Sequence, residues 1–278
     1  MRVDRSKSEK SYIINAPLPQ HGATYTVISH KDVIDATTEL LVKSNFRILN
    51  ESYRCNINAK VAQGIYYIAP NTVDPDIREE DELGMMFAWT NSYDKSVRFQ
   101  CAMGAYVFAC HNGMVCGELN YARKHTGTAR KDMYIQIQSQ IKNAEMVFKK
   151  IIEDKNSLKN KTLSSAEQAE IAGKMFFNED LLTANQISCI KDEISKPSYN
   201  YGVDESTAWQ FYNHVTHAYK TTHPKMWLSN TKKFHDYIMT EIKSNGIASN
   251  DSNWNDDLTK AKLAEDVFEI EDSYIAFI

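Results

Sequence analysis

The chain has 278 residues, of which 42% are hydrophobic and 24% are charged, and its formal net charge at pH 7 is −4. A chain of this length and composition can bury a real hydrophobic core in one large or two modest domains. No apolar run approaches the roughly 18 residues that a membrane-spanning helix needs, and no apolar stretch follows the charged N-terminus, so we expect a soluble, cytoplasmic protein without membrane contact.

The charges are unevenly distributed along the chain. Residues 1–150 hold 19 Lys and Arg against 16 Asp and Glu, whereas residues 151–278 hold 13 against 20. This gradient predicts a cationic face in the first half and an acidic tail.

The first half of the chain has the pattern of a helix followed by antiparallel strands. Apolar residues recur at helical spacing over 30–43. Residues 46–59, 61–69, 84–90, 97–111 and 114–119 then have the composition of strands. The dipeptide Asn112-Gly113 predicts a two-residue hairpin turn between the last two of them.

The second half of the chain is predicted to be helical. A long helix begins near Lys131, since Ile137, Ile141, Phe148 and Ile151 follow at spacings of three, four or seven. A further helix begins at Ser164 or Ser165 with a capping box to Glu167, and others are expected over 183–195, 204–220 and 228–244.

These elements predict an α+β fold, in which an antiparallel β-sheet packs against the long helix and is followed by a helical region and an acidic tail. The expected organisation is a polar leader at 1–24, an α+β core domain at 25–160, a helical region at 161–244, and an acidic linker with a hydrophobic-tipped tail at 245–278.

Four blocks of sequence carry a resemblance to a known family. They are residues 91–96 (NSYDKS), 107–114 (VFACHNGM), 123–127 (RKHTG) and, more weakly, 209–216 (WQFYNHVT). In this order they resemble the phage/plasmid-like protein family known as domain of unknown function 932, over roughly residues 30–220. The resemblance implies a phage or plasmid origin, with the host cytoplasm as location, and implies no activity.

A cationic segment stands between the last strand and the long helix. Backbone amides around Gly127 and the helix N-terminus would add to its attraction for phosphate, and aromatic rings beside cations suit single-stranded nucleic acid. The candidate nucleic-acid-binding residues are Tyr93, Arg98, Tyr121, Arg123, Lys124, His125, Thr126, Arg130 and Lys131. The alternative is a basic loop that pairs with acids elsewhere in the chain.

The order of helix, strands, basic loop and long helix is similar, in topology alone, to the ring-forming single-strand annealing proteins of phages and eukaryotes. This similarity implies a homo-oligomer that binds single-stranded DNA or RNA. The tail ends in Tyr274, Phe277 and Ile278, which would bind a phage or host replication protein; an ordinary amphipathic terminal helix is the alternative.

The leading hypothesis is therefore a phage or plasmid protein that binds or anneals single-stranded DNA in recombination or replication. The alternatives are an interaction protein acting on a host or defence protein and a metal-dependent nuclease. No catalytic residue, metal site or cofactor is predicted: nucleotide-binding and serine-hydrolase motifs are missing from the sequence, and neither Cys110, His111 and Cys116 nor His214 and His217 form a complete zinc motif.

Overall fold

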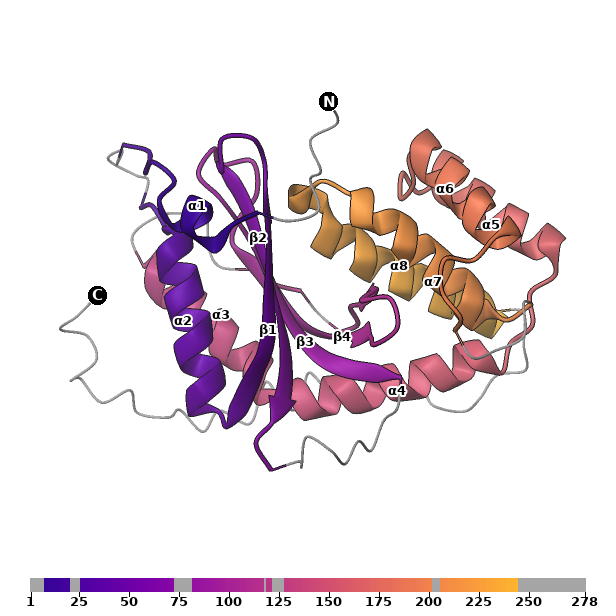
Figure 1. Ribbon diagram of the computed structural model, residues 1–278, viewed down its shortest axis with the longest axis horizontal. Helices are drawn as coiled ribbons and strands as arrows, with labels where there is room; N and C mark the ends of the chain where they lie inside the picture. Colours follow the sequence, from indigo (N-terminus) through magenta and orange to yellow (C-terminus); the bar gives the residue numbers. More distant parts are fainter. Residues whose placement is uncertain are drawn as a thin grey trace. The chain divides into compact units, whose positions relative to one another are not determined.

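The computed structural model describes residues 8–20, 26–72, 82–117, 119–121, 128–201 and 206–244. The chain divides into two units by internal contacts, Met1–Ile242 and Lys243–Ile278. The first unit holds every strand described here and almost all of the described helical residues (Figure 1).

An antiparallel sheet forms the centre of the first unit. Five strands lie side by side in sequence order, and a short sixth strand pairs with the beginning of β4. The strands are β1 (Phe46–Cys55), β2 (Val61–Pro70), β3 (Leu83–Ser92), β4 (Gln100–Val107), β5 (Gly113–Met114) and β6 (Asn120–Tyr121).

Helices cover both faces of this sheet. Trp89 of β3 faces the ring of His30 at the start of α2, whereas the next residue, Thr90, donates to the backbone oxygen of Pro224 at the start of α8. Because neighbouring strand residues point to opposite faces, α2 and α8 lie on opposite sides, as Figure 1 shows. The helices are α1 (Lys10–Ile14), α2 (His30–Lys43), α3 (Ala129–Lys142), α4 (Ala144–Lys159), α5 (Ser165–Phe177), α6 (Ala184–Ser195), α7 (Ala208–Ala218) and α8 (Pro224–Ser244).

This double cover explains why the central strands are buried along nearly their whole length. All eight residues of β4 and nine of the ten in β3 are buried. Sheets with both faces covered have continuous apolar strands instead of an alternation of apolar and polar residues. The predicted α+β class is confirmed, while the predicted acidic tail lies outside the described residues.

Local side-chain hydrogen bonds account for several helix starts. Ser29 and Asp32 form a capping box at α2, and the predicted box between Ser164 and Glu167 is present at α5. A third capping box joins Thr183 at the start of α6 to Gln186. Each such cap stabilises a helix by about 1 kcal/mol, and the one box predicted from the sequence, at Ser164, is confirmed.

The predictions of one helix and one turn are wrong. The long helix is two helices, because α3 ends and α4 begins at Asn143, where ψ is 7°. The turn after β4 is not at Asn112-Gly113: Gly113 already pairs with Tyr106, and the residue with positive φ is His111, at 56°. Among the described residues, no helix is long and apolar enough to cross a bilayer.

Candidate functional site

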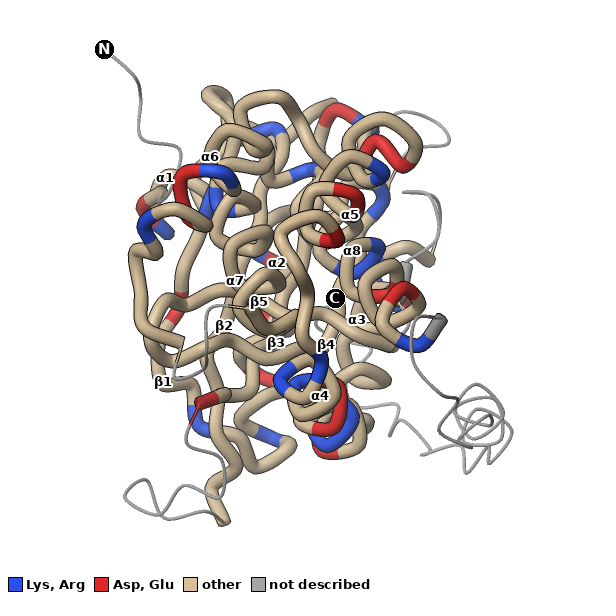
Figure 2. Tube along the Cα trace, turned by 90° about the vertical axis from the view of Figure 1, so that its right-hand side faces the viewer, with Lys and Arg blue, Asp and Glu red and all other residues tan. Residues whose placement is uncertain are grey.

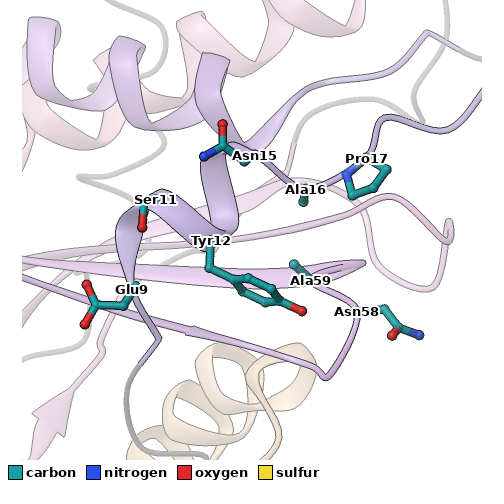
Figure 3. A pocket seen from close by; sticks show the side chains of 8 residues that line it. All are labelled: Glu9, Ser11, Tyr12, Asn15, Ala16, Pro17, Asn58 and Ala59. Carbon is teal, nitrogen blue, oxygen red and sulfur yellow. The ribbon is translucent and has the colours of Figure 1, made fainter.

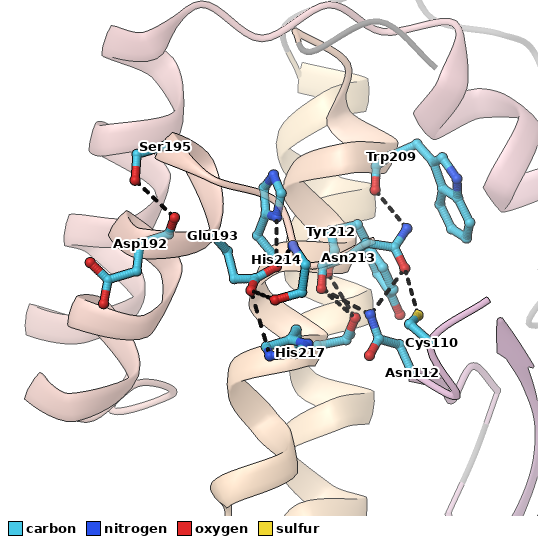
Figure 4. A network of polar contacts seen from close by, with 12 residues as sticks. Cys110, Asn112, Asp192, Glu193, Ser195, Trp209, Tyr212, Asn213, His214 and His217 are labelled. Atoms are coloured by element: carbon cyan, nitrogen blue, oxygen red, sulfur yellow. Dashed lines mark hydrogen bonds and ion pairs between the residues drawn. The ribbon is translucent and has the colours of Figure 1, made fainter. Parts of the chain in front are cut away.

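The first polar cluster joins the turn after β4 to α7 (Figure 4). The side-chain nitrogen of Asn112 donates to the backbone oxygen of Asn213 at 3.0 Å and to its Oδ1 at 3.2 Å. Asn213 in turn donates to the carbonyl of Trp209 at 2.9 Å, and Lys220 donates to the carbonyl of Cys110 at 2.6 Å. Both asparagines are buried, so these bonds replace those to water and fix the helix against the sheet.

The second polar cluster places one carboxylate between two imidazoles. Glu193 of α6 lies 3.7 Å from His214 Nδ1 and 3.6 Å from His217 Nε2 (Figure 4). Burial lowers the pKa of both histidines, although the charge of Glu193 acts in the opposite direction. Burial would raise the pKa of Glu193, but hydrogen bonds from Ser198 outweigh it and hold that pKa below its usual value.

Neither cluster has the arrangement of a nucleophile and its base. Burial raises the pKa of the Cys110 thiol, so it stays protonated at neutral pH. The hydrogen-bond partner of its sulfur is Asn213 Oδ1, at 3.9 Å, and not an imidazole. The first cluster therefore connects α7 to the turn after β4, and the second connects α6 to α7 through titratable groups.

A shallow groove with cations on two elements lies beside the start of β4. Its lining combines the segment before β4 with the first turns of α8: Ser96, Val97, Arg98, Gln100, Lys225, Met226 and Ser229. Arg98 is exposed, and neither Arg98 nor Lys225 makes an ion pair within the part of the chain that the structure describes. The groove holds about 380 Å³, which is near the lower end of ligand-site volumes.

The same groove is reached by β6. Tyr121 pairs through its backbone with Gln100, which lines the groove. The chain thus enters the predicted cationic segment from a position next to Arg98 and Gln100. The charge of Lys225 also acts on Asp94, just before the segment that lines the groove. Burial would raise the pKa of Asp94, but hydrogen bonds from Ser96 and Ser92 and the charge of Lys225 lower it.

A second depression has a different character. It lies between α1 and the β1–β2 turn and is lined by Glu9, Ser11, Tyr12, Asn15, Ala16, Pro17, Asn58 and Ala59 (Figure 3). Tyr12 donates to the carbonyl of Ile57 at 2.5 Å. Its lining has a carboxylate and no cation, so it does not suit an anionic ligand.

Four of the residues predicted to bind nucleic acid are described with their side chains, and the structure separates them. Arg98 and Lys131 are exposed, whereas Arg130 pairs with Asp32 of α2 at 3.0 Å. Tyr93 is 5% exposed and stacks on His30 with ring centroids 3.9 Å apart. Its predicted role as a stacking platform for bases is therefore corrected, because its ring lies in the core.

The structure does not describe the side chains of the other predicted site residues. Tyr121 is described by its backbone alone, and Arg123, Lys124, His125 and Thr126 lie outside the described residues, as do Tyr274, Phe277 and Ile278 in the tail. Two cations at the β1–β2 hairpin differ in exposure: Lys60 is exposed, whereas Arg54 is 7% exposed.

Comparison with known proteins places the chain in a family. Residues 17–254 match the model of a family described as a domain of unknown function (DUF932). The chain belongs to this family. No curated protein and no solved structure matches it.

Within this DUF932 chain, blocks of sequence that carry the resemblance make buried cross-links. Asn91 donates to the carbonyl of Ile28 at 2.9 Å, and the hydroxyl of Tyr93 accepts from the backbone nitrogen of His30 at 2.8 Å. Asn112 and Asn213 belong to two other blocks and bond to each other. In this chain, residues of these three blocks therefore hold neighbouring elements together.

Lys225 is the groove residue that the sequence prediction missed. The predicted helix began at residue 228, but α8 begins at Pro224. Proline is favoured at the first position of a helix, and the ring of His223 accepts a hydrogen bond from the backbone of Lys225 at 3.1 Å. The dipeptide His223-Pro224 was the signal that would have placed Lys225 on the first turn.

Proposed function

We propose that this DUF932 protein binds single-stranded nucleic acid, in the recombination or replication of a phage or plasmid. Single-stranded DNA is the expected ligand, and RNA is the other polymer that the surface would fit. The protein acts as a homo-oligomer in the host cytoplasm, without a catalytic step.

The observation that carries this proposal is the groove between the segment before β4 and α8. Arg98 and Lys225 lie in one groove, each without an ion pair to a described residue. Other cations are paired with acids: Lys31, Lys43 and Lys232 each contact a carboxylate one turn away on their own helix. Figure 2 shows the same mixing of charges along α4. Two cations in one groove, neither in an ion pair with a described residue, would attract a phosphate backbone, while the charge of Asp94 acts on Lys225 from beside the groove.

The sequence next to this groove extends the argument. After Tyr121 come Arg123, Lys124, His125 and Thr126, and exposed Lys131 follows on α3. Because β6 begins this stretch beside Gln100, the proposed path of the strand runs from the groove toward α3. Tyr121 is the stacking residue of this proposal.

Salt-dependent binding of a labelled single-stranded oligonucleotide tests the proposal. Loss of two phosphate contacts should reduce the slope of log affinity against log salt by about 1.4, so we expect that reduction for Arg98→Gln combined with Lys225→Gln. The matched control is Lys31→Gln with Lys43→Gln, which removes the same charge from two exposed, already paired lysines on α2. Equal loss in both pairs, or no binding by the wild type at low salt, contradicts the proposal.

The same samples distinguish the alternatives. Light scattering after size-exclusion chromatography, with and without oligonucleotide, measures the proposed self-association. Magnesium-dependent degradation of the oligonucleotide would indicate a nuclease instead. Absent nucleic-acid binding from a folded, oligomeric protein would favour an interaction protein that acts on a host or defence protein.

A further inference from the structure

Three potential metal ligands from distant parts of the sequence meet in the core. Cys116 follows β5, Asp154 lies on α4 and His235 lies on α8. Their ligand atoms are all within 4.8 Å of one another, and the three residues are 5%, 4% and 2% exposed. We propose that Cys116, Asp154 and His235 bind one divalent cation of the zinc type.

The donor set suits such an ion. Zinc accepts thiolate, imidazole and carboxylate ligands in tetrahedral geometry, with bonds of about 2.0–2.3 Å. These lengths place ligand atoms roughly 3.3–3.8 Å apart, so the observed cluster needs only small side-chain adjustments. One thiolate and one carboxylate balance the two positive charges of the ion. Magnesium and calcium, which prefer oxygen ligands, fit less well.

The surroundings hold the ligands in the required orientation. The hydroxyl of Tyr212 lies 3.2 Å from His235 Nδ1. The other ring nitrogen, Nε2, faces Asp154 and lies 3.2 Å from its Oδ2. Lys150 contacts the other carboxylate oxygen of Asp154 at 2.9 Å, so Oδ2 is the oxygen available to the ion. Two of the three ligands thus have a hydrogen-bonded or ion-paired partner behind them, as is typical of protein metal sites.

The protonation states without metal add a measurable consequence. Burial raises the pKa of the Cys116 thiol to about 12. Burial would also raise the pKa of Asp154, but its bonds to His235 and Lys150 keep that pKa below its usual value. The carboxylate is thus already ionised at neutral pH and the thiol is not. Metal binding should release about one proton per ion.

This site differs from the prediction that the sequence holds no metal site. Cys116 is separated from Asp154 and His235 by 38 and 119 positions, so no spacing motif joins them. Only the packing of α4 and α8 near the end of β5 brings the three together. A bound ion would connect these elements and stabilise the folded chain by mass action.

The metal content of the purified protein tests the proposal directly. The full-length wild-type protein is stripped with a chelator and dialysed against zinc, and we expect one zinc per chain with about one proton released. Cys116→Ser should lose at least nine-tenths of the zinc. Cys189→Ser is the control, since Cys189 is a half-buried thiol on α6 outside the cluster, and it should retain the wild-type amount.

Cobalt gives a second measurement that needs no variant. Co²⁺ bound by Cys116 should show thiolate-to-cobalt charge-transfer absorption in the wild type.

Tyr212→Phe, which removes the partner of His235, should weaken zinc binding about tenfold to a hundredfold. No zinc and no charge-transfer band in folded wild-type protein, or unchanged zinc in Cys116→Ser, would overturn the proposal. Neither outcome depends on nucleic-acid binding.

Discussion

Arg54 gives a sharp test of how the helical part of the chain is held to the sheet. Its Nε donates to Gln63 Oε1 at 2.9 Å, and one terminal nitrogen donates to the carbonyl of Lys220 at 2.9 Å. The guanidinium also lies 5.6 Å from the ring centroid of Trp227. Burial lowers the pKa of Arg54 to about 10, so the group is still charged at pH 7. It makes no ion pair with any residue that the structure describes.

The two partners should respond differently to substitution. Gln63→Leu removes an acceptor from a buried charge, which costs about 3 kcal/mol or more, because the penalty of a lost partner is larger for a charged group than for a neutral one. Arg54→Met removes the charge itself and leaves only neutral acceptors unpaired, at a cost of about 1–3 kcal/mol. The double variant should cost less than the sum of the two, because Gln63 then has no charge to satisfy.

Urea unfolding at pH 7, followed by circular dichroism, measures these free energies. Gln168→Leu is the control, since Gln168 is a buried glutamine that donates to a neutral carbonyl, that of Leu163, at 3.0 Å. It should cost about 1–2 kcal/mol. The reasoning fails if Arg54→Met is as destabilising as Gln63→Leu, or if the two changes are additive.

Three further predictions concern buried contacts. In the folded protein the pKa values of His214 and His217 lie below their usual 6.5. Their contribution to the free energy of unfolding is therefore complete above pH 6.5 and is lost as the pH falls, so urea midpoints measured from pH 8 to pH 5 should decrease. Gly113→Ala would place its Cβ 2.7 Å from an indole on α8 and should cost about 1–3 kcal/mol in the same unfolding assay. Tyr93→Phe leaves the backbone nitrogen of His30 without its acceptor, costs about 1–2 kcal/mol, and should leave oligonucleotide affinity unchanged; weaker binding would return Tyr93 to the interface.

The helices were predicted best where local chemistry decides their ends. The helix at His30–Lys43 has the predicted bounds, and the cap at Ser164 is where its sequence pattern places it. The apolar period across Asn143 carried no sign of a break, because Ile141 before it and Ala144 after it are both buried apolar residues. Hydrophobic spacing alone cannot distinguish one helix from two in line.

The turn after β4 was mispredicted for a non-local reason. Asn112-Gly113 has the composition of a hairpin turn, but the side chain of Asn112 bonds to Asn213, 101 positions away. The approach of Trp227 to Gly113 also requires a residue without a side chain there. Tertiary contacts thus use the same residue types that a turn would use, and the sequence pattern does not reveal which of the two applies.

A similar distinction separates three of the four family blocks from the groove in this protein, while the remaining block, residues 123–127, belongs to the cationic segment of the proposed function. Asn91, Tyr93 and Asn213 carry the resemblance to the DUF932 family, and all three are buried. Asn91 and Tyr93 bond to the segment at the start of α2, and Asn213 bonds to Asn112 in the turn after β4. Arg98 and Lys225, which carry the proposed function, lie in an open groove outside those blocks. Changes in the first group should therefore alter the free energy of unfolding, and changes in the second should alter binding without altering stability. A stability loss in the groove variants equal to that of an Asn213 variant would mean that the groove, too, belongs to the scaffold.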